Sequence, residues 1–135
     1  MPNGFHGAPQ EWARLEMPLT KLDARLVNFA YKHQLSLSKN HRGYPERSLR
    51  SSDDGLQRLI QIYLEDEHDL TLNLWICASE DRGDERFWKR QFLCRAVPAQ
   101  EIDDNLESLL REAFEIGQSW TRTDLEFGTK IRRHP

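Results

Sequence analysis

Residues 56–78 read LQRLIQIYLEDEHDLTLNLWICA, and this stretch decides the expected fold. On both sides of the acidic segment 65–69, apolar residues recur at every second position, as they do in half-buried strands. A hairpin that pairs Leu64 with Leu70 also puts Ile62 beside Leu72, so the apolar side chains share one face. The stretch therefore predicts two long antiparallel strands with one buried face.

A second hairpin should follow, turning at residues 82–84, where Gly83 suits a three-residue loop. The register that this loop sets places Leu74 beside Phe92 on the apolar face. A slip of one residue would turn Lys89 toward the core, which is costly for an unpaired polar group. Further upstream, Leu35 and Leu37 alternate with serines and predict a short fourth strand.

Apolar residues at helical spacing flank these strands and predict one helix from about Pro18 to Lys32 and another from Pro98 to about Ile116, ending at Gly117. Both helices should cover the apolar face of the sheet, because a two-layer sandwich buries that face and both helix stripes at once. We therefore expect one α+β domain over residues 1–135, a four-stranded antiparallel β-meander with N- and C-terminal helices on one face. Residues 1–10 and 129–135 should be flexible tails.

Composition narrows the function classes. The 135 residues have a formal net charge of −3, which disfavours a general electrostatic grip on nucleic acid. The chain has no long apolar run and no apolar leader near Met1, so we expect a cytoplasmic protein without a membrane span. The sequence shows no nucleophile motif, phosphate-binding loop or metal-ligand spacing, and we assign it no catalytic residue, metal or cofactor.

The first candidate site is a long connection, Lys39 to Gly55, which is rich in arginine. Connections of this length inside a small domain are usually functional or mobile. Its arginines and tyrosine could contact an anionic group through forked hydrogen bonds, joined by an arginine on the core side of the following strand. The candidates are Arg42, Tyr44, Arg47, Arg50 and Arg58. Alternatively, Arg58 pairs with an acidic residue on a helix and the other arginines are only solvated.

The second candidate site is the outward face of the sheet. The expected register places large apolar residues there among amides and basic residues, a composition typical of protein interfaces. The apolar members are Leu59, Tyr63, Trp75 and Leu93. The alternative is that the C-terminal segment, with Trp120, Leu125 and Phe127, folds over this face.

These features predict a protein-binding module of the immunity, chaperone or adaptor type, acting through the open sheet face, the arginine-rich loop or both. Its partner would be another protein or a second copy of the chain. A different hypothesis is an enzyme or small-ligand binder with an anionic ligand near Tyr44, Arg47, Arg50 and Arg58. A third is RNA binding, with Tyr63 and Trp75 stacking on bases.

Overall fold

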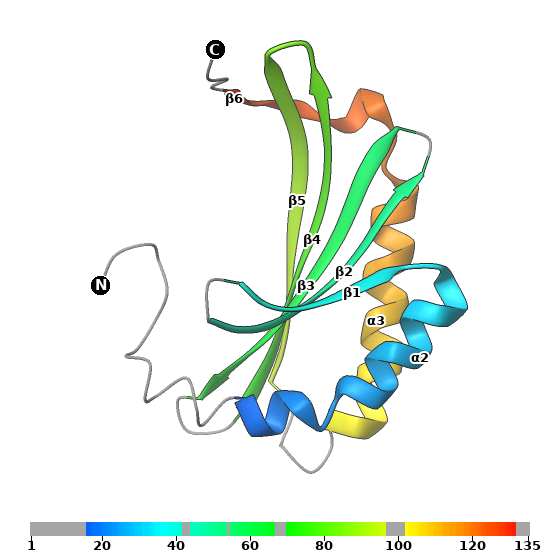
Figure 1. Cartoon of the computed structure of the whole chain (residues 1–135), viewed down its shortest axis with the longest axis vertical. Helices are drawn as coiled ribbons and strands as arrows, with labels where there is room; N and C mark the ends of the chain where they lie inside the picture. The colour runs from blue at the N-terminus through cyan, green and yellow to red at the C-terminus, as the bar shows by residue number, and fades with distance from the viewer. Residues whose placement is uncertain (1–15, 42–43, 54, 67–69, 97–101, 132–135) are drawn as a thin grey trace.

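The sheet holds six antiparallel strands that follow one another in chain order (Figure 1). The computed structural model of the protein describes residues 16–131, apart from 42–43, 54, 67–69 and 97–101. The strands are β1 (Ser36–His41), β2 (Tyr44–Asp53), β3 (Leu56–Asp66), β4 (Leu70–Arg82), β5 (Glu85–Ala96) and β6 (Glu126–Lys130). The chain is therefore α+β with an antiparallel sheet, as expected, but the expectation of only four strands was wrong.

The two additional strands, β2 and β6, come from segments that we expected to be irregular. Within the long connection, β2 pairs with β1 and with β3 along its length, from Arg47 opposite Ile62 to Asp53 opposite Leu56. At the C-terminal end, β6 pairs with β5 and brings Lys130 opposite Glu85. Residues 129 and 130, which we expected in a flexible tail, are thus part of the sheet.

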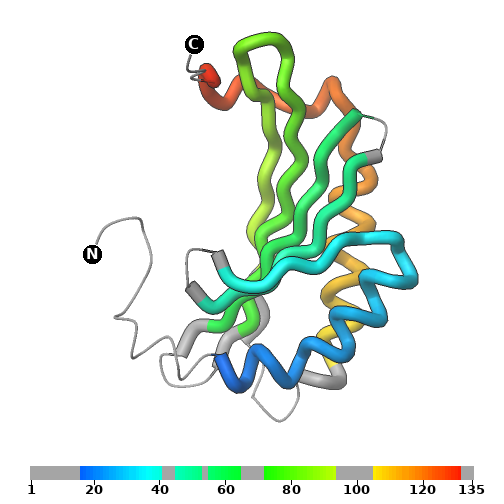
Figure 2. The backbone as a smooth tube through the Cα atoms, viewed as in Figure 1, coloured from blue at the N-terminus to red at the C-terminus, as the bar shows by residue number. Residues whose placement is uncertain are grey.

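Two main helices, α2 (Asp23–His33) and α3 (Ile102–Ser119), lie on the same side of the twisted sheet (Figures 1 and 2). The N-terminal helix is interrupted: residues 16–20 are helical, a turn follows at 21–22, and α2 ends at Gln34 in a left-handed conformation with φ 58°. None of the described helices is long and apolar enough to cross a membrane. After α3, a short 3-10 helix (Arg122–Asp124) leads into β6.

The buried core lies between the helices and the sheet and contains most of the side chains that periodicity assigned to it. The central strands contribute Ile60, Ile62, Leu72, Leu74 and Ile76, and the helices Leu26, Phe29, Leu106 and Leu109. Phe92, which we also expected in the core, is 41% exposed, and Phe114 is only partly buried. The error at Phe92 follows from the register of β5.

Both hairpin registers differ from those expected. In β3 and β4, Leu64 pairs with Leu72 instead of Leu70, a shift of two residues that leaves every side chain on its expected face. Between β4 and β5, only Gly83 and Asp84 form the turn, and Arg82 pairs with Glu85. Because Gly83 has φ 66°, it can take the first position of a tight two-residue turn. This one-residue shift exchanges the two faces of β5.

Candidate functional site

The side of the sheet opposite the helices, here called the outer face, carries an aromatic cluster. Tyr63 lies on β3, Trp75 on β4, and Trp88 and Phe92 on β5. Trp75 pairs across the strands with Phe92, and their ring centroids are 4.8 Å apart. On its other side, the indole Nε1 of Trp75 donates a hydrogen bond to the Tyr63 hydroxyl over 3.0 Å. The cluster is thus held in place by direct ring and hydrogen-bond contacts.

Arg90 extends this cluster toward solvent. Its guanidinium carbon lies 5.0 Å from the ring centroid of Trp88 and 5.9 Å from that of Trp75. Contacts of a cation with aromatic ring faces are favourable and limit the positions that the side chain samples. The accessible part of the outer face is centred here and on Phe92, because Asn73, farther along the face beside Tyr63, is 1% exposed.

The sequence reasoning found half of this cluster. Tyr63 and Trp75 lie on the outer face as expected, and so does Leu59, which is partly buried. Leu93, however, pairs with Leu74 and packs against the core on the helix side, because of the shifted β5 register. The same shift brings Phe92 to the outer face, and the short Gly83-Asp84 turn was the signal that could have revealed it.

The C-terminal segment does not cover the outer face. Trp120 and Leu125 belong to the buried cluster on the helix side, with 6% and 7% exposure. The register of β5 places Lys89 on the helix side of the sheet. Its ammonium lies 5.5 Å from the Trp120 ring centroid, and this cation–π contact offsets part of the cost of placing a charge near the core. Phe127 on β6 packs edge-on against Phe87 at 5.9 Å. The helices α2 and α3 lie together on the opposite side of the sheet (Figure 1).

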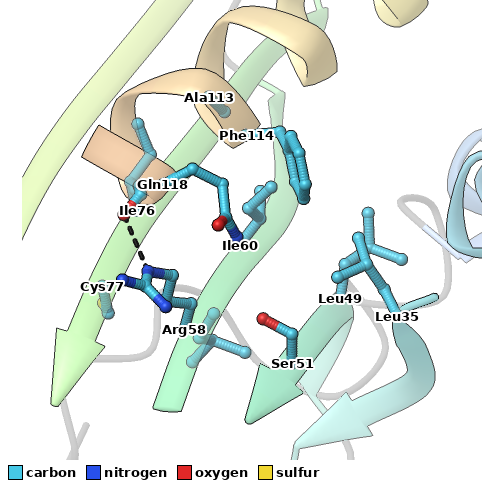
Figure 3. A pocket seen from close by; sticks show the side chains of 12 residues that line it. Leu35, Leu49, Ser51, Arg58, Ile60, Ile76, Cys77, Ala113, Phe114 and Gln118 are labelled. Atoms are coloured by element: carbon cyan, nitrogen blue, oxygen red, sulfur yellow. Dashed lines mark hydrogen bonds between the residues drawn. The ribbon is translucent and has the colours of Figure 1, made fainter. Parts of the chain in front are cut away.

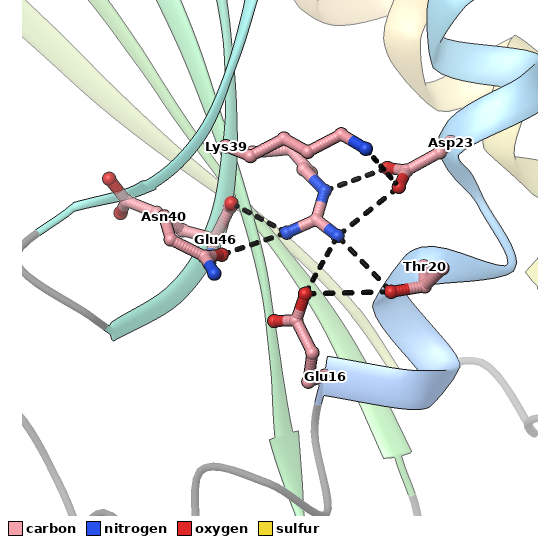
Figure 4. Close-up of polar contacts among 7 residues, drawn as sticks. Glu16, Thr20, Asp23, Lys39, Asn40 and Glu46 are labelled. Atoms are coloured by element: carbon pink, nitrogen blue, oxygen red, sulfur yellow. Dashed lines mark hydrogen bonds and ion pairs between the residues drawn. The ribbon is translucent and has the colours of Figure 1, made fainter.

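Arg47 lies in the interior and bonds to Glu16 and Asp23 of the N-terminal helical segment, whose carboxylates are labelled in Figure 4. Its side chain is 1% exposed, and it forms two hydrogen bonds with the Asp23 carboxylate, of 2.7 Å from Nε and 3.2 Å from Nη2. Nη2 also lies 3.1 Å from Glu16 Oε1. Partial burial alone would raise the pKa of Asp23, but hydrogen bonds and charges from Arg47 and Lys39 outweigh it and lower that pKa.

The remaining donors of the Arg47 guanidinium are also occupied. They bond to the Asn40 side chain at 2.9 Å, the Glu46 carbonyl at 3.0 Å and the Thr20 hydroxyl at 3.3 Å. A buried guanidinium is tolerated when its donors and charge are both matched in this way. With no donor left over, Arg47 is a structural residue and offers no hydrogen bond to a ligand.

Arg58 is 7% exposed and caps the C-terminal end of α3. Its Nε donates to the Gly117 carbonyl at 2.9 Å and its Nη2 to the Trp120 carbonyl at 2.8 Å. Carbonyls at a helix end lack intrahelical partners and carry partial negative charge, so a cation is favourable there. The expectation of an arginine on the core side was therefore correct, and Arg58 donates hydrogen bonds to these two main-chain carbonyls.

A narrow cavity lies beside Arg58, between β2, β3 and α3 (Figure 3). The cavity has a volume of about 10 Å³, which is enough for roughly one water molecule. Ser51 lines it, and its buried hydroxyl has no hydrogen-bond partner among the described residues. A bound water would satisfy that hydroxyl, whereas a larger ligand would not fit.

The arginines proposed for an anion site are not brought together. Arg47 and Arg58 point to the helix side, four positions apart across the β2–β3 ladder, and Arg50 points to the outer face. Arg42 and the side chain of Tyr44 lie outside the described residues. A second, shallow cavity of about 160 Å³ between the helices is lined by Arg25, Asn28, Phe29, Lys32, Glu107 and Leu110. The candidate arginines Arg47, Arg50 and Arg58 do not line it.

Cys77 offers no activated nucleophile on the outer face. Burial raises the pKa of its thiol, and the opposing charge of Arg90 does not overcome this effect. The thiol is therefore protonated at neutral pH, and only thiolates react readily. Among the described residues, no group of His, Cys, Asp and Glu side chains is arranged to hold a metal ion.

Of the two sites expected from the sequence, the outer face is the one that remains a candidate, around Phe92, Trp75, Arg90 and Arg50. Comparison with known proteins adds no assignment: no protein-family model, no curated protein and no solved structure matches the chain.

Proposed function

We propose that this protein is a protein-binding module of the immunity, chaperone or adaptor type that acts through the outer face of its sheet. The observation that carries the proposal is Phe92, which is 41% exposed yet packs on Trp75 on a face that no described helix covers. Large aromatic side chains beside arginine are the residue types that contribute most binding energy in protein interfaces.

The arrangement of the cluster supports a rigid docking surface. Contacts to Tyr63, Phe92 and Arg90 surround Trp75, so these side chains lose little further freedom when a partner binds. Ordering flexible side chains is one of the main costs of association, and preorganisation lowers it. A partner side chain that covers Phe92 would therefore gain most of the apolar contact energy at a small entropic cost.

A protein partner fits this surface better than RNA or a small ligand. Bases stack on open aromatic faces, but Trp75 has Phe92 and Arg90 against it and its indole N–H is occupied. The net charge of −3 does not favour a polyanion. Small ligands need cavities of several hundred Å³, whereas the narrow cavity near Ser51 holds about 10 Å³ and the cavity between the helices lies on the other side of the sheet.

A selection from a phage-displayed library of random peptides tests this function. We expect the wild-type protein to enrich peptides whose affinity, measured by calorimetry with the synthetic peptides, falls about tenfold or more in Phe92→Ser, the loss typical of an interface hot spot. Tyr31→Ser is the matched control, because Tyr31 is 88% exposed on α2, away from the outer face. The proposal is wrong if the selected peptides bind Phe92→Ser and wild type equally well.

A further inference from the structure

Four residues of the outer face form a single row that runs across the strands. Arg50 on β2 pairs with Leu59 on β3, Leu59 pairs with Cys77 on β4, and Cys77 pairs with Arg90 on β5. Directly paired residues in antiparallel strands point to the same face. The row therefore has a basic residue at each end and two partly buried side chains between them, an apolar leucine and a cysteine.

The spacing of the row follows from sheet geometry. Neighbouring strands lie about 4.8 Å apart, so the Cα atoms of Arg50 and Arg90 are separated by about 14 Å over three strand intervals. Both side chains are exposed. The aromatic pair Trp75 and Phe92 lies two positions along β4 and β5 from the row, on the same face.

Neither terminal arginine is neutralised. Within the described part of the chain, no carboxylate lies within ion-pair distance of Arg50 or Arg90, in contrast to Arg86 on the same face, which bonds Asp81 at 2.8 Å. Glu46, an acidic residue on the same strand as Arg50, is 8% exposed and has contacts of its own. The accessible outer face thus carries positive charge at two separate points and an aromatic pair beside Arg90.

We propose that the occupant of the outer face is an acidic segment of another protein that crosses the strands along this row. One carboxylate pairs with Arg50 and another with Arg90, while apolar side chains of the segment cover Leu59 between the two arginines and Phe92 beside Arg90. Two turns of an α-helix span about 11 Å, so acidic residues two turns apart come within reach of both flexible arginine side chains. This inference rests on the proposed function and specifies the chemistry of the partner.

A second copy of the chain fits the row less well. Pairing two outer faces would bring arginines near arginines, and the accessible part of the described outer face has no unpaired carboxylate to offer in return. Like charges brought together at an interface oppose association. Charge complementarity therefore selects a different, acidic protein.

The amino-acid composition of selected peptides tests the inference. The library is selected in parallel on wild type, on Arg50→Glu/Arg90→Glu and on the control Lys21→Glu/Lys32→Glu, which makes the same charge change at exposed positions of the N-terminal helical region. We expect wild type and the control to enrich peptides with acidic residues on both sides of an apolar one. The double arginine variant should bind these peptides about tenfold or more weakly and enrich basic peptides.

The outcomes separate this inference from the proposed function. Peptides that require Phe92 but show no excess of acidic residues, or that bind Arg50→Glu/Arg90→Glu normally, overturn the acidic partner and leave the binding module standing. Absence of any Phe92-dependent peptide overturns both. A random single-stranded RNA, tested by fluorescence anisotropy, overturns both if it binds more tightly than the peptides and loses this binding in Phe92→Ser. Thermal unfolding followed by circular dichroism confirms that each variant is folded.

Discussion

Replacing Arg47 by alanine should destabilise the fold strongly, although this residue lies in a stretch that resembles a surface loop. The change removes a guanidinium that is 1% exposed and hydrogen-bonded to two carboxylates, leaving Asp23, at 14% exposure, without its main partner. Removing one member of a buried ion pair typically costs 3–5 kcal/mol. Lys39 still lies 3.2 Å from Asp23 and Glu16 is 40% exposed, so we expect the lower end, about 3 kcal/mol.

Urea unfolding followed by circular dichroism measures this loss, with Arg50→Ala as the matched control. Arg50 is three positions away on the same strand but exposed and without an ion-pair partner, so its removal should change the free energy of unfolding by less than about 0.5 kcal/mol. Equal effects of the two substitutions would refute the interior role of Arg47. Arg47→Lys keeps the charge but loses the forked geometry, and should recover only part of the stability.

Three further predictions concern pH and packing. The ionised Asp23 carboxylate stabilises the folded state above its unfolded-state pKa, and this stabilisation is lost as pH falls through its lowered folded-state pKa. The difference in unfolding free energy between wild type and Asp23→Asn, measured by urea titration, should therefore narrow below about pH 4. A difference independent of pH would contradict this. Leu74→Ala, at a position with 0% exposure, should cost about 2–5 kcal/mol, and Phe92→Ser only about 1 kcal/mol, with equal losses arguing against the observed β5 register. Arg58→Met should cost about 2 kcal/mol and accelerate amide hydrogen exchange in the last turns of α3, and unchanged exchange would show that the cap is dispensable.

The outer face shows how a site can be half visible in a sequence. Alternation along β3 and β4 was sufficient to place Tyr63 and Trp75 opposite the core. Alternation could not place Phe92 and Arg90 in the same way, because both faces of β5 carry a mixture of apolar and polar residues. Their placement depends on whether two or three residues form the turn after Arg82, a difference set by the backbone conformation of Gly83 and Asp84.

The strand β2 was missed for a different reason. Its helix-facing positions include Arg47 and Ser51 on either side of Leu49, so the apolar alternation that marks a strand is absent. Arg47 occupies a core position only because the helical segment around Asp23 supplies carboxylates from 24 residues away in the chain. Such compensation is invisible to a local pattern.

What the sequence determined by itself are the elements whose stability comes from apolar periodicity: the central strands β3 and β4, the helices and the side of the sheet that they cover. Burying apolar side chains favours the same elements in any compact arrangement, so local patterns were enough to find them. Tertiary structure alone decided the pairing of β2, the interior position of Arg47 and the main-chain partners of Arg58. Those depend on hydrogen bonds and charges between segments distant in sequence, and these interactions exist only once the chain has folded.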